Sequence, residues 1–193
     1  MSKKPLALVD LDGTLADYAG AMCRDMLKLS SPAELDELTG IFMRGGDEAY
    51  HIPHLKARMD LIKTKKDWWF NLERLPAGFK VVDMLRDLKF RLNILTRGPK
   101  NLSDCWGEKH KWSRTYVPDA DISIVSDKTP HYGRVLVDDW IPYVIPWLNK
   151  RARGTVIMPA QPWNEGFSHP QVVRYDSNDD EVYAALKAQR DRK

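Results

Sequence analysis

The sequence predicts an α/β fold in which a doubly wound, Rossmann-like parallel sheet carries a small helical insertion after its first strand. Two patterns indicate this fold: short continuous apolar runs recur along the chain, and helical patterns lie between them. A third observation is the stretch from residue 18 to residue 75, which holds helical patterns but no convincing strand. Strands that alternate with helices are typical of a parallel sheet with helices on both faces.

The first apolar run, Leu6–Val9, ends on a carboxylate and a turn with glycine, which is typical of a central strand buried on both faces. Four later runs share this character: Arg91–Leu95, Ile122–Val125, Val135–Val137 and Thr155–Met158. Apolar residues at helical spacing predict three helices between the strands: Gly78–Lys89, Asn101–Tyr116 and Tyr143–Arg151. The closing residues Ala188–Lys193 predict only a fraying, solvated helix end.

The strand-free stretch is interpreted as a helical cap, residues 18–75, placed over a core domain of residues 1–17 and 76–193. Ser31, Pro32 and Glu34 have the pattern of an N-cap, a first-turn proline and a capping-box acid, opening a helix through Leu38. His51 and His54 have a spacing that suggests a metal site. The proline between them opposes a regular helix and no further ligand is evident, so loop histidines are expected.

The composition indicates a soluble globular protein of one domain plus an insertion, since 193 residues contain 43% hydrophobic and 30% charged side chains. A net charge of +3, spread along the chain, does not favour a nucleic-acid partner. Cys23 and Cys105 lack a disulfide or zinc spacing, which fits a reducing compartment. The apolar run near the N-terminus is too short for a signal peptide or membrane span, so a cytoplasmic protein with no membrane partner is expected.

Polar side chains follow four of the predicted strands at the points where these strands end. Ligands of open α/β sheets bind beyond the carboxyl ends of the strands, so these residues mark a candidate site. In strand order, the set is Asp10, Asp12, Gly13 and Thr14; Thr96 and Arg97; Ser126, Asp127 and Lys128; and Asp138 and Asp139. A concentration of carboxylates needs a cation to neutralise it, and hard oxygen ligands suit Mg²⁺.

The segment LVDLDGTLAD resembles the first motif of the haloacid dehalogenase (HAD) superfamily, hhhDxDGT. Thr96, Lys128 and the Asp138–Asp139 pair resemble its second, third and fourth motifs in the same order, each at the end of a predicted strand. The resemblance implies the HAD fold and a phosphatase in which Asp10 attacks phosphorus and briefly carries the phosphoryl group. It also implies that Asp12 protonates the leaving oxygen and then deprotonates the incoming water.

The same resemblance implies a Mg²⁺ cofactor held by the Asp10 carboxylate, the Asp12 backbone carbonyl and one aspartate of the pair at 138–139. Asp139 is the favoured ligand, with Asp138 orienting a metal-bound water.

Thr96 is expected to hydrogen-bond a phosphate oxygen, and Lys128 to neutralise the phosphorylated aspartate. Taken singly, these residues have simpler interpretations: the aspartate pair as a helix cap, Thr96 as a turn former and Lys128 as a surface lysine. Their joint occurrence in motif order favours the site.

Three further stretches resemble the 5'(3')-deoxyribonucleotidases, small HAD enzymes that remove phosphate from deoxynucleoside monophosphates. CWGEKHKW resembles CxxEKYxW, SDKTPHYGRVLVDD resembles RDKTxxxGDLLIDD, and WWFNLERLPAG resembles FFxxLxPxPGA. The resemblance implies a small deoxynucleotide substrate whose base binds beneath the cap. A homodimer is compatible with the sequence.

The expected substrate-binding residues combine the phosphate site with aromatic side chains that can pack against a base. They are Asp12, Tyr18, Phe42, Trp69, Thr96, Arg97 and Lys128. Core packing is the alternative interpretation of Tyr18 and Phe42, and only one of Trp68 and Trp69 is expected to face the pocket. Arg97 replaces a serine of the relatives and adds a cation that suits a more anionic or larger substrate, unless it faces outward.

Two neighbouring features are interpreted as structural. Trp112 is expected to pack within its helix interface, and Glu108 with Lys109 to lie on a helical surface.

Three other functions remain open at this point. The same chemistry suits a 3'-phosphatase acting on nucleic-acid ends, or a HAD phosphatase for another small phosphorylated metabolite. A non-catalytic binding protein on a HAD scaffold is the remaining alternative, although every motif residue is retained.

Overall fold

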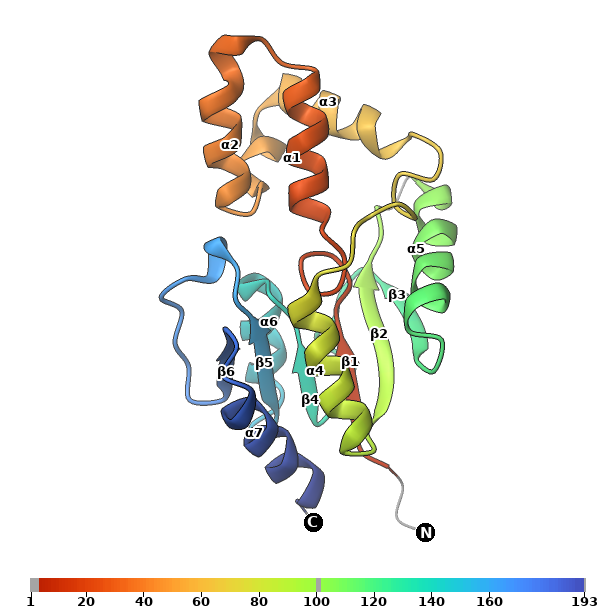
Figure 1. The fold of residues 1–193 in the computed structure, drawn as a ribbon, viewed down its shortest axis with the longest axis vertical. Helices are drawn as coiled ribbons and strands as arrows, with labels where there is room; N and C mark the ends of the chain where they lie inside the picture. Colours follow the sequence, from red (N-terminus) through yellow and green to blue (C-terminus); the bar gives the residue numbers. More distant parts are fainter. Residues whose placement is uncertain (1–3, 100–101, 193) are drawn as a thin grey trace.

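Six parallel strands form one sheet in the computed structural model, which describes residues 4–99 and 102–192. The strand order is β3-β2-β1-β4-β5-β6 (Figure 1), which confirms the predicted doubly wound sheet. The strands are β1 (Leu6–Val9), β2 (Arg91–Arg97), β3 (Asp121–Val125), β4 (Val135–Val137), β5 (Thr155–Pro159) and β6 (Val172–Tyr175). The order reverses between β1 and β4, so the crevice where such sheets bind ligands lies at the ends of these two strands.

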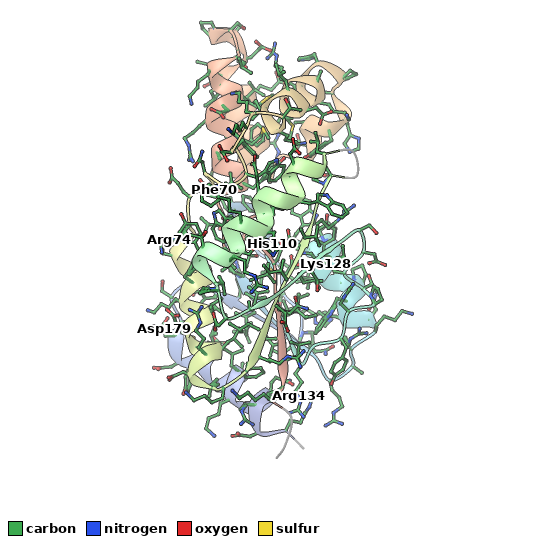
Figure 2. The ribbon with its side chains drawn as sticks, turned by 90° about the vertical axis from the view of Figure 1, so that its right-hand side faces the viewer. Phe70, Arg74, His110, Lys128, Arg134 and Asp179 are labelled. Carbon is green, nitrogen blue, oxygen red and sulfur yellow. The ribbon has the colours of Figure 1, made fainter. Side chains whose placement is uncertain are left out.

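Helices cover both faces of the sheet and form the insertion. They are α1 (Tyr18–Lys28), α2 (Leu35–Met43), α3 (Pro53–Lys63), α4 (Pro76–Asp87), α5 (Ser103–Tyr116), α6 (Ile141–Asn149) and α7 (Asp179–Asp191). Short 3-10 helices are η1 (Pro32–Glu34), η2 (Asp47–His51) and η3 (Pro162–Asn164). Figure 1 shows α4 and α7 in front of the sheet with α6 behind it, and the turned view in Figure 2 shows α5 across the near side.

Alternate residues of the strands pack into two separate hydrophobic cores, one on each face of the sheet. Ala7 and Val9 of β1 belong to the larger cluster with residues of α4, α5 and α7, whereas Leu8 between them belongs to the smaller cluster with α6. This two-sided burial explains why the central strands are continuous apolar runs. Trp112 of α5 and Trp147 of α6 are fully buried in the respective clusters, so the prediction that Trp112 packs inside is confirmed.

The helical insertion, Tyr18–Lys63, lies beyond the carboxyl ends of the strands (Figure 1). Its helices α1, α2 and α3 bury Met22, Met26, Leu38 and Met59 against one another. The Asp17 carboxylate caps α1 by accepting from the backbone N–H of Gly20 at 2.9 Å.

The two chain connections between insertion and sheet run side by side and pair with each other. The N–H of Asp17 donates to the carbonyl of Glu73, and the N–H of Leu75 donates to the carbonyl of Leu15, both at 2.8 Å. Between these bonds, Ala16 forms an antiparallel bridge with Arg74. The chain therefore enters and leaves the insertion through one short paired segment.

Several predicted boundaries shift in the structure. The helix predicted at Tyr143–Arg151 begins earlier, at Ile141, because Pro142 fits a first helical turn. The predicted start of α5 at Asn101 lies outside the described residues. The helix opened by Ser31 is a 3-10 turn followed by α2, which ends at Met43 rather than Leu38.

Two sequence interpretations were wrong or incomplete. Neither histidine lies in a loop: His51 ends the 3-10 helix η2, and His54 lies in the first turn of α3, because Pro53 starts this helix instead of interrupting one. Strand β6 and most of α7 were not predicted. Strand β6 is only partly buried at the sheet edge, and α7 buries only Val182 and Leu186, so both have weak apolar patterns.

Within the described residues, no helix has the length and apolar content needed to cross a membrane.

Gly78 in the first turns of α4 allows this helix to approach the turn after β1. A Cβ added at Gly78 would overlap the carbonyl oxygen of Thr14. We expect Gly78→Ala to lower the free energy of unfolding by about 1–3 kcal/mol, measured by urea denaturation. The matched control is Gly107→Ala in α5, where an added Cβ meets nothing within 4 Å. This control should gain up to about 1 kcal/mol, and equal effects at both sites would contradict the packing argument.

Candidate active site

The turn after β1 places two loops in direct contact. The N–H of Asp10 donates to the carbonyl of Val137 at 2.8 Å, which extends the pairing of β1 with β4. The chain then turns through Gly13 at φ +81°, a left-handed conformation that favours glycine. A Cβ at Gly13 would also overlap the Asp139 carboxylate. Glycine at this position therefore allows the two acidic loops to meet.

Three buried carboxylates meet at the ends of β1 and β4. Asp10, Asp138 and Asp139 each offer an oxygen atom, and these atoms lie within 4.8 Å of one another. Lys128, from the loop after β3, is buried between two of them, with its Nζ 2.6 Å from Asp10 and 2.7 Å from Asp138. The structure thus brings together four of the predicted residues, with three acids facing one ammonium.

Burial and mutual repulsion shift the protonation of this cluster. Burial raises the pKa of Asp138 to about 6, against the opposing charge of Lys128. Burial, followed by the charges of Asp138 and Asp10, raises the pKa of Asp139 well above its usual range. Burial disfavours the charge of Lys128, but the Asp10 and Asp138 carboxylates outweigh it and raise the pKa of its ammonium. Lys128 therefore stays protonated, but its single positive charge does not neutralise all three carboxylates.

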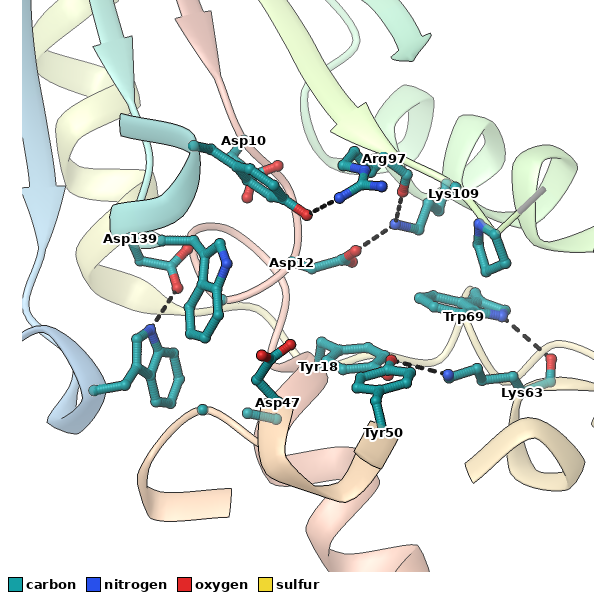
Figure 3. A pocket seen from close by; sticks show the side chains of 18 of the residues that line it. Asp10, Asp12, Tyr18, Asp47, Tyr50, Lys63, Trp69, Arg97, Lys109 and Asp139 are labelled. Atoms are coloured by element: carbon teal, nitrogen blue, oxygen red, sulfur yellow. Dashed lines mark hydrogen bonds and ion pairs between the residues drawn. The ribbon is translucent and has the colours of Figure 1, made fainter. Parts of the chain in front are cut away.

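The two aspartates of the pair have different neighbours. Asp138 accepts from Lys128 and from the backbone N–H of Trp140 at 3.0 Å. Asp139 accepts from two neutral donors, Thr14 Oγ1 at 2.7 Å and Trp163 Nε1 at 2.9 Å. The second of these bonds is the dashed line at Asp139 in Figure 3. Among the described residues, Asp138 has a cationic partner and Asp139 has none.

Asp12 is held by a lysine that we had expected on the surface. Lys109 of α5 is 1% exposed, and its ammonium pairs with the Asp12 carboxylate (Figure 3). It also donates to Thr96 Oγ1 at 3.2 Å and to the Arg97 carbonyl at 2.5 Å, so three acceptors surround it. The surface prediction for Lys109 was wrong, because a polar residue on a helix can face a charged site as well as solvent.

Glu108 also has a structural contact rather than a free surface position. Its carboxylate accepts from the backbone N–H groups of Asp67 at 2.7 Å and Trp69 at 2.9 Å. It ties α5 to the segment that returns from the insertion.

One oxygen of Asp12 remains unpartnered. Asp12 Oδ1 is buried and has no hydrogen-bond partner in the described part of the chain. Burial raises the pKa of Asp12, although the Lys109 ammonium opposes the shift. A part-buried carboxyl with a raised pKa and a free oxygen is suited to exchange a proton with a ligand.

Thr96 and Arg97 at the end of β2 occupy different positions. Thr96 is fully buried, and its Oγ1 donates to the Arg97 carbonyl at 3.3 Å while it accepts from Lys109. Within the described residues, Thr96 does not line the cavity. Arg97 does, and its guanidinium donates to the Tyr143 hydroxyl and lies 5.2 Å from the centre of that ring. Arg97 therefore faces the site.

A cavity of about 470 Å³ separates these residues from the insertion (Figure 3). Its lining on the sheet side includes Asp10, Asp12, Arg97, Lys109, Lys128, Asp139, Trp140, Tyr143 and Trp163. On the other side it includes Tyr18, Gly45, Asp47, Tyr50, Asp60, Lys63 and Trp69.

The insertion side of the cavity combines aromatic rings with hydrogen-bond donors. Tyr18 stacks on Trp69 with ring centres 5.4 Å apart, and its hydroxyl lies 2.9 Å from that of Tyr50. Lys63, 6% exposed, donates to Tyr50 at 2.9 Å. The two hydroxyl groups together carry two hydrogens. Their mutual hydrogen bond uses one of them, so the other can be donated to a ligand.

Two aromatic residues lie outside the lining of this cavity. Trp68 donates its indole N–H to Asp25 at 3.0 Å, and its ring packs edge-on against Trp69 with ring centres 4.9 Å apart. Phe42, which we expected to bind substrate, is 4% exposed in the insertion core, where it packs against Gly46. Its position matches the alternative interpretation as a core residue.

Sequence reasoning missed several residues of the site. Lys109, Tyr50 and Lys63 lie within helices, and Tyr143 and Trp163 follow β4 and β5 at a distance. A signal existed only for Lys109, since it belongs to the stretch CWGEKHKW already compared with CxxEKYxW.

A doubly wound sheet with acids after β1 and β4 and a lysine after β3 defines a HAD-type hydrolase. Solved structures support this class of fold. A HAD family hydrolase from Deinococcus radiodurans R1 superposes with a TM-score of 0.56 at 16% identity, covering 98% of this chain and 97% of that chain. L-2-haloacid dehalogenase from Xanthobacter autotrophicus gives 0.51 at 10% identity, covering 82% and 78%.

The chain belongs to the family described as 5' nucleotidase, deoxy (pyrimidine), cytosolic type C, whose model matches residues 4–189. It is 26% identical to the human cytosolic-type 5'(3')-deoxyribonucleotidase over 147 residues, 72% of each chain. It is 30% identical to the mouse mitochondrial 5'(3')-deoxyribonucleotidase over 142 residues, 68% of this chain and 63% of that protein. The protein is therefore a phosphatase of the 5'-nucleotidase class.

The contacts of Lys109 generate a prediction for Lys109→Met. Loss of the ammonium leaves the part-buried Asp12 carboxyl without its cation, so we expect stability to fall by about 1–3 kcal/mol at neutral pH. We also expect kcat to fall by roughly 100-fold or more, because Asp12 loses its orientation. Urea denaturation and turnover of p-nitrophenyl phosphate measure the two effects. Lys111→Met on the same helix, with a 58% exposed side chain, is the control and should be nearly neutral. Full activity of Lys109→Met would contradict the role of this contact.

Proposed function

We propose that this protein is a Mg²⁺-dependent phosphomonoesterase that dephosphorylates deoxynucleoside monophosphates through an aspartyl-phosphate intermediate. One observation carries the proposal: the buried cluster of Asp10, Asp138 and Asp139 faces a cavity whose opposite wall is aromatic. The acids supply phosphoryl chemistry and the wall supplies a surface for a base. The names of the similar 5'(3')-deoxyribonucleotidases support this substrate class.

The cluster fits a magnesium ion. The Lys128 ammonium pairs with Asp10 and Asp138 and leaves Asp139 without a cation among the described residues, and hard oxygen donors suit Mg²⁺. Asp10 and Asp139, with the backbone carbonyl of Asp12, would hold the ion, because both oxygens of Asp138 already accept hydrogen bonds, one from the Lys128 ammonium and one from the Trp140 N–H. When bound, Mg²⁺ neutralises charge on the phosphoryl oxygens and polarises the phosphorus–oxygen bonds.

The chain's own residues divide the reaction into two displacements. An oxygen of Asp10 forms a bond to phosphorus while the bond to the leaving oxygen breaks, and Asp12 gives its proton to that oxygen. A water molecule then attacks phosphorus as Asp12 takes its proton, which breaks the Asp10–phosphorus bond and releases inorganic phosphate. Lys128 stays charged beside Asp10 in both steps and offsets the negative charge that moves onto this carboxylate.

The cavity suits a compact substrate with a flat apolar part. About 470 Å³ lies within the range of small-molecule sites, and Tyr18 with Trp69 provides an aromatic surface. Lys63 and Tyr50 add donors at the end remote from the acids. We infer that residues 18–75 act as a cap on a core of residues 1–17 and 76–193. Such a cap favours a mononucleotide over the end of a nucleic acid.

We also propose a cytoplasmic location. The similarity to the human cytosolic-type enzyme supports it, whereas the mitochondrial relatives support an organelle. Imaging the tagged full-length protein distinguishes the two.

The proposed substrate class is tested by a panel of 5'- and 3'-monophosphates of deoxynucleosides and ribonucleosides, with Mg²⁺. We expect turnover of deoxynucleoside monophosphates, and a loss of at least about 10³-fold in Asp10→Asn because the nucleophile is removed. Asp36→Asn, on the exposed part of α2, is the control and should retain activity. Turnover of a sugar phosphate or a 3'-phosphorylated oligonucleotide, with every mononucleotide inert, would reject the nucleotidase assignment.

The raised pKa of Asp138 predicts a pH dependence of stability in metal-free protein. A carboxyl whose pKa is higher in the folded state contributes fully below its unfolded pKa, and the contribution is lost as pH rises to the folded pKa. We expect the melting temperature in EDTA to fall as pH rises from the ordinary aspartate pKa, 3.8, to about 6. Saturating Mg²⁺ should suppress the fall, because the cation favours the ionised acids. Identical pH profiles with and without Mg²⁺ would argue against a metal at this cluster.

The aromatic wall predicts that Tyr18→Ala weakens binding of nucleotides specifically. Loss of the ring should raise KM for a deoxynucleoside monophosphate by roughly 10-fold, since aromatic packing contributes about 0.5–1.5 kcal/mol beyond area burial. KM for p-nitrophenyl phosphate should change less if that smaller ester does not reach the wall. Tyr132→Ala, 62% exposed, is the control. Equal changes for both esters would show that Tyr18 acts on the site as a whole.

A further inference from the structure

The segment after β5, residues 161–164, donates three side-chain hydrogen bonds to the two acidic loops. Gln161 Nε2 donates to the Gly13 carbonyl at 2.7 Å. Trp163 Nε1 donates to Asp139 Oδ2 at 2.9 Å, the bond drawn at Asp139 in Figure 3. Asn164 Nδ2 donates to the Asp139 carbonyl at 3.1 Å. The motifs quoted above include none of these donors.

The sheet fixes this segment in turn. Asn164 is fully buried, and its Nδ2 also donates to the Pro159 carbonyl of β5 at 2.9 Å. Its Oδ1 accepts from the Gln161 N–H and from Arg174 Nε of β6, both at 3.1 Å. Asn164 therefore anchors the segment to β5 and β6, and these two strands fix the position of the neighbouring Trp163.

Trp163 completes a pair of donors that restrains the Asp139 carboxylate. Oδ1 accepts from Thr14 Oγ1 at 2.7 Å and Oδ2 accepts from Trp163. Rotation of the carboxylate would break both bonds, so its plane is fixed. Each oxygen keeps a lone pair for a further partner. Because an indole N–H can only donate, Asp139 Oδ2 is the acceptor in this contact.

The side chain of Trp163 also lies close to the helical insertion, at Gly45. Gly45 has φ +96°, and a Cβ there would lie 2.7 Å from the Trp140 ring and 3.3 Å from the Trp163 Cβ. Both tryptophans line the cavity. Trp163 thus lies close to Gly45 of the insertion and donates a hydrogen bond to Asp139.

We propose that Trp163 is a positioning residue that orients Asp139 for the metal ion and couples the seating of the insertion to metal binding. The inference rests on the proposed function, in which Asp139 is a Mg²⁺ ligand. Linkage makes the coupling reciprocal: Mg²⁺ stabilises the contact at Gly45, and a disturbed contact weakens Mg²⁺ binding.

The test is Mg²⁺ titration by calorimetry, without substrate, of the metal-free Trp163→Phe variant. Phenylalanine retains an aromatic ring but lacks the N–H, so we expect the Kd for Mg²⁺ to rise about 10- to 100-fold. Trp68→Phe is the matched control, because it also removes an indole N–H that donates to a carboxylate, that of Asp25. Its Kd should equal that of the wild type.

The titration of two further variants separates the possible results. Gly45→Ala should also raise the Kd, by several-fold, although its backbone binds no metal. Wild-type affinity in Trp163→Phe, together with lost binding in Asp139→Asn, overturns the inference and leaves the proposed function intact. Absence of Mg²⁺ binding in the wild type overturns both.

A measurement on the unaltered protein covers the case in which Trp163→Phe does not fold. The chain has seven tryptophans, and each indole N–H gives its own NMR signal. We expect Mg²⁺ to shift the Trp163 indole signal while that of Trp68 stays unchanged. An unshifted Trp163 signal at saturating Mg²⁺ overturns the inference.

Discussion

Repulsion among three buried carboxylates is the constraint on which the rest of the structure depends. Asp10, Asp138 and Asp139 lie at the ends of two adjacent strands with one oxygen of each within 4.8 Å of the others. Like charges at this distance, away from water, raise one another's pKa and oppose folding unless cations balance them. Lys128 supplies one positive charge. The folded state and the liganded state therefore depend on the same few atoms.

The backbone brings the acids together, and a second tier of side chains fixes their orientation. Parallel strands buried on both faces deliver Asp10 and Asp138 to one edge, and Gly13 lets the two loops touch. Lys109 then holds Asp12, and the donors after β5 hold Asp139. Each of these residues is tied to a helix or strand, so the site inherits the rigidity of the sheet.

The central fold and the acids were predictable because their signals are local. A buried strand is a continuous apolar run, and the residue that ends it is next to it in sequence, as with Asp10 after Val9. The weak patterns of β6 and α7 reflect partial burial. Lys109 is marked by no apolar run, because its partner Asp12 lies 97 positions away in the sequence. Trp163 lies in a 3-10 helix of three residues. Such a short element has no periodic apolar pattern from which the inward-facing side chain could be predicted.

The paired connection at Ala16 and Arg74 has an evolutionary consequence. Since the chain leaves and rejoins the sheet at neighbouring points, everything between them can be lengthened, shortened or replaced without changing a strand. In the proposed function, bond-breaking chemistry stays on one side of this junction and molecular recognition lies on the other. Selection can therefore act on the two almost independently, so a lineage can change what it recognises while it keeps the reaction it inherited.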